Sequence, residues 1–151
     1  MNKGFTLVEM LLSLTIIVAL LGISIPVFLG LNTRADVDAA KETLEIALRK
    51  AQAQARNQKN NSNWGVYVDS SNSEVIVFAG ASYATRDTSL DESLAIPGDV
   101  VINDGSTQEI VFDQLTGDLE GSTQTITLTV GTVEKSVQVS ALNGAIFEVS
   151  S

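Results

Sequence analysis

The pattern of apolar and polar residues changes twice along the chain, and its first part is almost entirely apolar. From Met10 to Leu31, 22 consecutive residues carry no charge. A helix of this length rises about 33 Å, which is enough to cross the hydrocarbon core of a bilayer. A cleaved secretory signal fits less well, because its apolar core holds only about 7–15 residues. Residues 5–31 are therefore predicted to form a membrane-spanning helix.

The second part, residues 32–59, has the period of an amphipathic helix. Its apolar residues recur at steps of three and four and form one narrow face, made by Val37, Ala40, Leu44, Ala47, Leu48, Ala51 and Ala55. Because most of these residues are alanines, a sheet can approach this face closely. The polar run that follows favours turns, so one helix from Phe5 to about Gln58, roughly 80 Å long, is expected.

The third part, residues 60–151, changes to a period of two, which is typical of strands that expose one face. The candidate strands are rich in Val, Ile, Thr and Phe, and turn-forming residues separate them. They are Trp64–Asp69, Glu74–Ala79, Val100–Asn103, Glu109–Asp113, Gln124–Val130, Val133–Ser140 and Ala145–Val149. Seven short strands after one long helix predict an α+β fold with a small sandwich of antiparallel sheets.

The connections between these strands differ in how clearly they can be predicted. Gly131-Thr132, between two strongly alternating runs, indicates a tight hairpin turn, and Asn143-Gly144 indicates another. Gly80–Asp99 has little periodicity. It is expected to be a long loop with a short helical turn near Leu90–Leu94.

Charge is distributed as unevenly as hydropathy. Residues 1–31 carry only Lys3 and Glu9, and residues 32–59 carry six basic and four acidic side chains. Residues 60–151 carry thirteen acidic side chains against two basic ones. Because an acidic surface repels phosphate backbones, nucleic acid is not an expected partner of the third part.

The composition also limits the chemistry that the chain can perform. It contains no Cys and no His, which excludes disulfides, thiolate metal sites and the commonest general base. No Ser lies in a G-x-S-x-G or S-x-x-K motif. We therefore predict no enzyme activity, no catalytic residue and no cofactor.

Two turns rich in side-chain oxygens, Asp69–Glu74 and Asn103–Gly105, are candidates for binding calcium. Neither has the regular alternation of oxygen ligands found in an EF-hand loop. Ordinary hairpin turns account for both runs. No metal is therefore predicted, and calcium binding in these loops is left open.

A short motif at the N-terminus distinguishes this chain from a simple membrane anchor. Glu9 interrupts the apolar segment, where a carboxylate is costly and persists mainly when it has a cationic partner or a function. The string Lys3-Gly4-Phe5-Thr6-Leu7-Val8-Glu9 closely resembles the signal of type IV prepilins and type II secretion pseudopilins. That resemblance implies a leader, residues 1–4, which a prepilin peptidase removes after Gly4. It also implies an N-methylated Phe5 and a role for Glu9 in assembly.

The resemblance gives the apolar helix a further feature, a helix-breaking proline that corresponds to Pro26. Gly22, Pro26 and Gly30 follow one another at steps of four. Pro26 removes the hydrogen bond to the Gly22 carbonyl, which predicts a kink. Small residues at this spacing equally suit close packing between membrane helices, and both interpretations remain open.

The third part is similar to the H-type minor pseudopilins and related minor pilins, the GspH/FimT group. The likeness rests on Trp64-Gly65-Val66, Ile110–Asp113 with Gly117, Thr125–Thr129, and Val137–Ser140 ending at Asn143-Gly144. It implies a type IV pilin-like fold, in which a long N-terminal helix packs on an antiparallel sheet domain. The expected organisation is a leader (1–4), an assembly helix (5–31), an amphipathic helix (32–59) and a globular domain (60–151).

These resemblances imply a non-enzymatic minor pseudopilin or pilin. Its expected partners are other pilin or pseudopilin subunits, the prepilin peptidase and an inner-membrane assembly platform. The expected location is the bacterial inner membrane, with a single span and the C-terminal domain outside the cytoplasm, and the filament after assembly.

The alternative function is that of a competence-type minor pilin that binds DNA. Relatives of that kind use Arg and Lys near the C-terminus, whereas residues 141–151 contain none. The sequence leaves several questions open: secretion pseudopilus or surface pilus, major or minor subunit, and which cargo or adhesion target is involved.

Overall fold

The structure is a computed structural model, and it describes residues 4–97, 100–103, 109–141 and 143–149 of the chain. It does not describe the side chains of residues 22–32, 103, 148 and 149. The chain separates into two compact units, Met1–Thr33 and Arg34–Ser151, and each is described by itself. Every buried apolar residue of the described chain, from Val37 onward, lies in the second unit.

One helix, α1 (Leu7–Arg56), contributes to both units. Its backbone stays helical across Gly22 and Pro26. The kink expected there involves residues whose side chains are not described, so it stays a prediction. α1 ends two residues before the expected position, and the 3₁₀-helix η1 (Lys59–Asn61) follows it.

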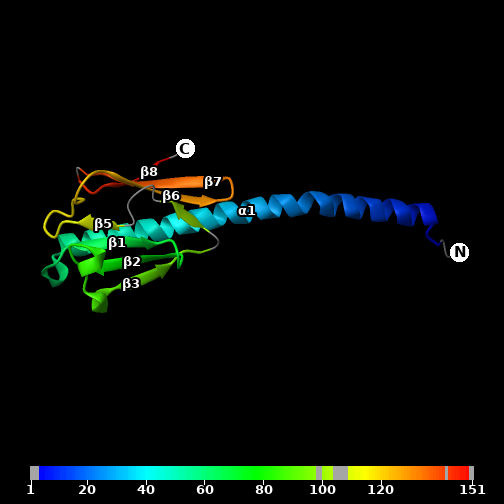
Figure 1. The fold of residues 1–151 in the computed structure, drawn as a ribbon. Helices are drawn as coiled ribbons and strands as arrows, with labels where there is room; N and C mark the ends of the chain where they lie inside the picture. Colours follow the sequence, from blue (N-terminus) through cyan, green and yellow to red (C-terminus); the bar gives the residue numbers. More distant parts are fainter. Residues whose placement is uncertain (1–3, 98–99, 104–108, 142, 150–151) are drawn as a thin grey trace. The chain divides into compact units, whose positions relative to one another are not determined.

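In the second unit, two four-stranded antiparallel sheets lie along the C-terminal part of α1 (Figure 1). The first sheet has the order β3-β2-β1-β5, with strands Glu92–Ala95, Glu74–Ala79, Trp64–Asp69 and Glu109–Phe112. The second has the order β4-β6-β7-β8, with strands Val101–Asn103, Gln124–Val130, Val133–Val139 and Ile146–Val149. This arrangement confirms the predicted α+β, type IV pilin-like fold.

The core of this unit forms where the sheets cover one face of α1. All seven residues of the predicted apolar face of the helix, from Val37 to Ala55, are fully buried. Trp64, Val66 and Val68 of β1 pack into the same cluster, as do Ile126 and Leu128 of β6. The small alanine side chains leave room for both sheets to reach the helix, so the predicted amphipathic face is confirmed.

The first sheet also buries its opposite face. Gly65 and Tyr67 of β1 pair with Phe78 and Ile76 of β2, and both of these β2 side chains are buried although they lie outside the main core cluster. The segment 80–91 contributes a cover: the Tyr83 ring stacks on the Tyr67 ring, with centroids 3.7 Å apart. Burial is the main reason why the pKa of Tyr83 is raised above its ordinary value.

Arg86 completes this cover. Its guanidinium lies 3.6 Å from the Tyr83 ring centroid, donates to the Tyr83 carbonyl and pairs with the Asp91 carboxylate at 2.7 Å. The hydrogen bond to Asp91 is the main reason why the pKa of Arg86 is raised. The segment is thus ordered by specific contacts.

Part of the prediction for Gly80–Asp99 was therefore wrong. Residues 92–95 form the edge strand β3, and the helical turn is η3 (Thr88–Leu90), slightly before the expected place. Another 3₁₀ turn, η2 (Tyr83–Thr85), precedes it. β3 is stabilised by its pairing with β2, from Glu74–Ala95 to Val77–Glu92. Its four residues are mostly exposed, and four residues are too few to show an alternation of apolar and polar side chains.

The tight turn predicted between β6 and β7 is confirmed. Val130 and Val133 are paired, and Gly131 has φ +59°, a value that favours glycine. Asn143-Gly144 also turns the chain, but it lies inside a longer connection, residues 140–145. There the Gly144 N–H donates to the Ser140 carbonyl at 3.0 Å.

Two side chains at the end of α1, Gln52 and Arg56, hold the loops that precede β6 and β8; we call this pair the helix-end clamp. The Gln52 amide donates to the carbonyls of Gly117 and Gly144, both at 2.9 Å. Arg56 donates to the neighbouring Thr116 and Asn143 carbonyls. A Cβ on Gly144 would lie 2.4 Å from the Gln52 amide nitrogen, so this close approach requires glycine.

The loop that carries Gly117 is shaped by a carboxylate. Asp113 accepts hydrogen bonds from the backbone N–H groups of Leu115, at 2.9 Å, and Thr116, at 3.1 Å, and from the Thr116 hydroxyl. These bonds, with that of Leu115 first, lower the pKa of Asp113 below its ordinary value. The charged form of Asp113 therefore supports the folded loop.

Replacing Gln52 by alanine should destabilise the second unit. The change leaves two loop carbonyls without their donor, which typically costs about 1–3 kcal/mol of unfolding free energy. Urea denaturation of residues 34–151 measures this cost. Arg49→Ala, on the exposed side of the same helix, is the control and should change the unfolding free energy by less than about 0.5 kcal/mol. Equal effects of the two substitutions would contradict the role of the clamp.

The acid stability of the unit should depend on Asp113. Because its folded pKa is depressed, its contribution is complete above the ordinary value of 3.8 and is lost as pH falls through the lower folded value. Asp113→Asn keeps an acceptor for the loop N–H groups but does not titrate. Its unfolding free energy should therefore fall less steeply than that of the wild type between about pH 5 and pH 2.

Urea denaturation at a series of pH values measures the two slopes. Leu115→Ala is the matched control, because it changes an exposed side chain of the same loop and keeps the carboxylate. It should retain the steep slope of the wild type. Parallel curves for Asp113→Asn and the wild type would show that the carboxylate charge does not stabilise the loop.

Candidate assembly segment and groove

The N-terminal residues are arranged by a helix cap. The Thr6 hydroxyl accepts a hydrogen bond from the Glu9 backbone N–H at 3.3 Å, and the Thr6 carbonyl accepts one from the Met10 N–H. Thr6 is therefore the N-cap of α1, and Thr6-x-x-Glu9 matches the spacing of a capping box. As a consequence, Gly4 and Phe5 lie ahead of the helix, and the Phe5 side chain is 78% exposed.

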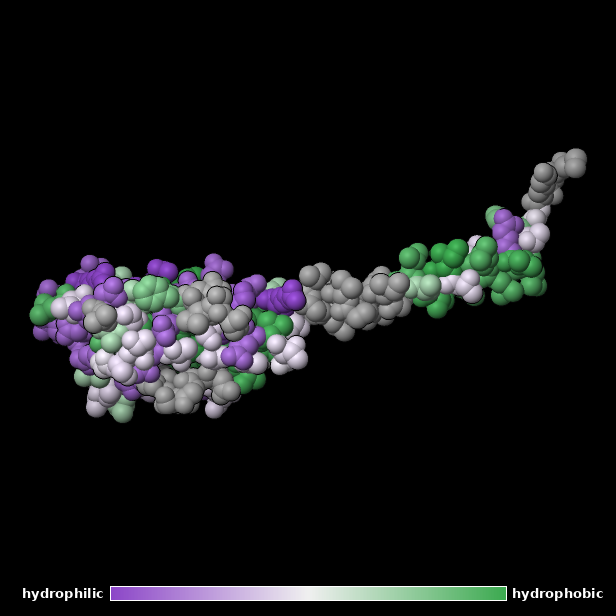
Figure 2. Space-filling view, turned by 90° about the horizontal axis from the view of Figure 1, so that it is seen from above, coloured by the Kyte–Doolittle hydropathy of each residue, from purple (hydrophilic) through white to green (hydrophobic). Residues whose placement is uncertain are grey.

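The part of α1 that follows has no apolar core of its own. From Phe5 to Leu21, large hydrophobic side chains are exposed on all sides of the helix: Phe5, Leu7, Val8, Met10, Leu11, Leu12, Leu14, Ile16, Ile17, Val18, Leu20 and Leu21. Figure 2 shows hydrophobic residues over most of the visible face of this segment. A helix that is apolar all round buries that surface only against other molecules or lipid.

Glu9 is the acidic residue of this apolar segment, and it too is exposed. Its backbone N–H and carbonyl are both used inside the helix, by Thr6 and by the Ser13 hydroxyl. Within the described residues no side chain pairs with its carboxylate. The structure thus brings Gly4, Phe5 and Glu9 together at one end of α1, whereas Gly22 and Pro26 lie further along the same unit.

Over the residues that the structure describes, no helix reaches the length and hydropathy needed to cross a membrane.

The first candidate calcium turn joins β1 to β2 and is organised by Asp69. Its carboxylate accepts hydrogen bonds from the Ser71 and Asn72 N–H groups and from the Asn72 side-chain amide. The Asn72 side chain is the main reason why the pKa of Asp69 is lowered. Asp104 and Gly105 of the second candidate lie outside the described residues. The described part of the chain contains no group of three or more acidic side chains placed to hold a metal ion.

Trp64, the first residue of β1, is a core residue. It is 2% exposed, and its indole N–H donates to the Lys59 carbonyl at 2.9 Å. The Lys59 ammonium lies 5.1 Å from the centre of the same ring. These contacts fix the chain where it leaves α1 and enters β1.

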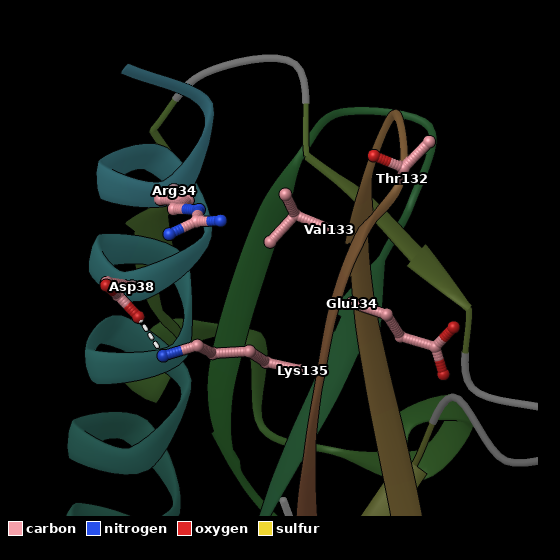
Figure 3. A pocket seen from close by; sticks show the side chains of 6 residues that line it. All are labelled: Arg34, Asp38, Thr132, Val133, Glu134 and Lys135. Carbon is pink, nitrogen blue, oxygen red and sulfur yellow. Dashed lines mark hydrogen bonds and ion pairs between the residues drawn. The ribbon is translucent and has the colours of Figure 1, made fainter. Parts of the chain in front are cut away.

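An open groove lies between the start of α1 in the second unit and the β6–β7 turn (Figure 3). Its volume is about 700 Å³, and six residues line it: Arg34 and Asp38 from the helix, and Thr132, Val133, Glu134 and Lys135 from the turn. The Lys135 ammonium pairs with the Asp38 carboxylate across the groove. This groove cannot be predicted from the local sequence, because only the fold brings residues 34–38 and 132–135 together.

Two protein-family models match the chain. The prokaryotic N-terminal methylation motif matches residues 1–25, and type II transport protein GspH matches residues 40–143. No curated protein matches the chain. No solved structure matches it either. Because the GspH match covers more than half of the chain and the methylation motif precedes it, the chain belongs to the type II transport protein GspH family, whose members are minor pseudopilins or pilins of type II secretion systems or type IV pili.

Proposed function

We propose that this chain is a non-enzymatic structural subunit that enters a pseudopilus or pilus through its N-terminal helix. The observation that carries this proposal is the exposed apolar surface of α1 from Leu7 to Leu21, which nothing in the described chain covers. In the inner membrane, lipid would cover this surface. In the filament, the equivalent helices of neighbouring subunits would replace the lipid.

Processing prepares the end of this helix. The prepilin peptidase cleaves after Gly4 and leaves an N-methylated, cationic amine on Phe5. The position of Thr6 as the N-cap supports this step, because Gly4 and Phe5 lie ahead of the helix and are exposed, where a protease can reach them.

Glu9 then sets the register between subunits. In an apolar surround, the Glu9 carboxylate and the Phe5 ammonium of a neighbouring subunit attract each other strongly, although desolvation cancels part of the gain. Leaving either charge unpaired would be costly. The requirement for a pair therefore selects one axial position among the many that apolar packing alone would tolerate.

The proposed organisation keeps the boundaries expected from the sequence, with a leader at residues 1–4, an assembly helix at 5–31 and an amphipathic helix at 32–59. The C-terminal domain, residues 60–151, lies outside the cytoplasm. Gly22 and Pro26 allow the helix to bend or to pack closely as the subunit leaves the membrane. The assembly platform of the inner membrane drives that movement.

A role in DNA capture has less support. Residues 60–151 contain only Arg86 and Lys135 as basic residues. Both are engaged within the domain, with Asp91 and Asp38. A surface that carries thirteen acidic side chains repels a phosphate backbone.

The mature chain should begin with N-methyl-Phe5. Intact-mass spectrometry of the protein purified from membranes of its native host should show the loss of residues 1–4 and the addition of one methyl group. Gly4→Val, which places a bulky side chain at the cleavage position, should yield the uncleaved form. A wild-type chain that retains Met1, or that begins beyond residue 20, would contradict the pilin-type processing.

Replacing Glu9 should block assembly but not insertion. Glu9→Val and Glu9→Gln leave the Phe5 ammonium of a neighbour without its partner, and breaking a buried pair from one side costs about 3–5 kcal/mol. The amount of subunit in sheared filaments, measured at equal membrane levels, should fall sharply for both variants while cleavage after Gly4 continues. Ser13→Val, one turn further along, removes no charge and is the control. Wild-type incorporation of Glu9→Val would show that helix packing alone holds the subunit.

A further inference from the structure

The cations of the described chain are almost all engaged within the chain itself. Lys41 and Arg49 approach Glu45, Lys50 pairs with Glu92, Arg86 with Asp91, and Lys135 with Asp38. Arg56 binds two loop carbonyls and Lys59 lies over Trp64. Of the lysines and arginines that the structure describes, Arg34 alone has no ion pair, hydrogen bond or ring contact.

Arg34 is also the cation that lines the groove without a partner. Its guanidinium extends from α1 into the space in front of the β6–β7 turn (Figure 3). The other cation of the groove, Lys135, is neutralised by Asp38. A planar guanidinium prefers to bind a carboxylate or phosphate with two parallel hydrogen bonds. The groove therefore presents one unsatisfied site for an anionic group.

We propose that this groove receives an acidic segment of a neighbouring filament subunit, with a carboxylate of that segment bound by Arg34. The proposal rests on the proposed function and names the surface through which the globular parts of subunits meet. The acidic side chains of such a subunit would provide the carboxylate that binds Arg34. In this chain residues 60–151 carry thirteen acidic side chains against two basic ones, so a subunit of similar composition presents mainly carboxylates.

The groove suits a protein segment better than the phosphates of a membrane surface. Its volume of about 700 Å³ accommodates several side chains, and Val133 and Thr132 add an apolar and a hydroxyl contact to the charged ones. The Asp38 carboxylate pairs with Lys135, and the Glu134 side chain points away from the helix (Figure 3). Arg34 is therefore the unpaired cation among the six lining residues, and the groove offers a single site for an anion. A short protein segment can place one carboxylate there, whereas an extended layer of lipid phosphates is attracted by a cluster of cations.

The test uses the full-length chain in its native host, with Arg34→Gln, Arg34→Glu and Arg34→Lys. Arg49→Glu is the matched control, because Arg49 lies on the same helix, is also exposed and undergoes the same charge change. All variants should be cleaved and present in the membrane at wild-type levels, since Arg34 makes no contact that the fold needs and Arg49 loses only an exposed i,i+4 pair with Glu45, which is worth little. Incorporation into sheared filaments should fall by roughly two- to fivefold for Arg34→Gln, the range expected for one exposed ion pair. It should fall further for Arg34→Glu.

A photoreactive benzoylphenylalanine at Thr132 identifies the occupant of the groove directly. We expect crosslinks to an acidic segment of another pilin-type subunit, and a lysine at the crosslinked carboxylate should restore assembly of Arg34→Glu. Wild-type incorporation of Arg34→Glu, a loss equal to that of Arg49→Glu, or crosslinks to lipid alone would overturn the inference. If the wild-type chain itself does not enter filaments, or if Glu9→Val does, the proposed function fails instead.

Discussion

The structure depends on the burial of one narrow face of α1 between two sheets. Four of the seven residues on this face are alanines, and all seven are inaccessible to solvent. An alanine contributes little apolar area, so its advantage here is closeness: it lets the strands approach the helix backbone, and Trp64, Leu44 and Leu48 then fill the remaining space. Interiors packed at this density tolerate an added methylene poorly. A larger residue at Ala47 or Ala51 would move a sheet away from the helix and disturb both halves of the domain at once.

The two parts of α1 have different environments. Up to Leu21 its side chains are apolar in every direction and exposed, whereas from Val37 onward it has one apolar face and a charged one. The second pattern is satisfied within the chain, and the first only by other molecules. Under the proposed function, folding and assembly therefore depend on separate parts of one helix. The domain has its own core, so a change at Glu9 or Phe5 can affect assembly without affecting the stability of residues 34–151.

The sequence predicted those features that rest on local periodicity and missed those that rest on side chains meeting across the fold. The buried face from Val37 to Ala55 and the strands β1, β2 and β6 follow from periods of 3.6 and two, which only the local sequence determines. β3 was missed because its pairing with β2 determines it, and its own four residues show no clear pattern. The helix-end clamp was missed for the same reason: Gln52 and Gly144 are 92 positions apart. The signal that the sequence contains is the pair of glycines, Gly117 and Gly144, which the structure shows with positive φ values. At the assembly segment, a family motif points to Gly4, Phe5 and Glu9, whereas the capping role of Thr6 follows from the spacing Thr6-x-x-Glu9 itself.

The separation of apolar and charged contacts also suggests how a filament subunit could combine high affinity with one defined position. In the proposed assembly, the apolar surface of α1 would supply most of the free energy of association, but apolar burial is proportional to area and tolerates sliding and rotation. Charges discriminate between positions because a mismatch leaves a desolvated group unpaired. In this chain the available charges are few, since nearly every described cation is engaged by a carboxylate, a carbonyl or a ring of its own domain. Arg34 is the exception among the described cations of the second unit, and Glu9 is the charged residue of the exposed apolar segment in the first unit. In the proposed assembly, Glu9 would constrain the position of the assembly helix and Arg34 that of the globular unit, a selectivity that apolar burial alone does not supply.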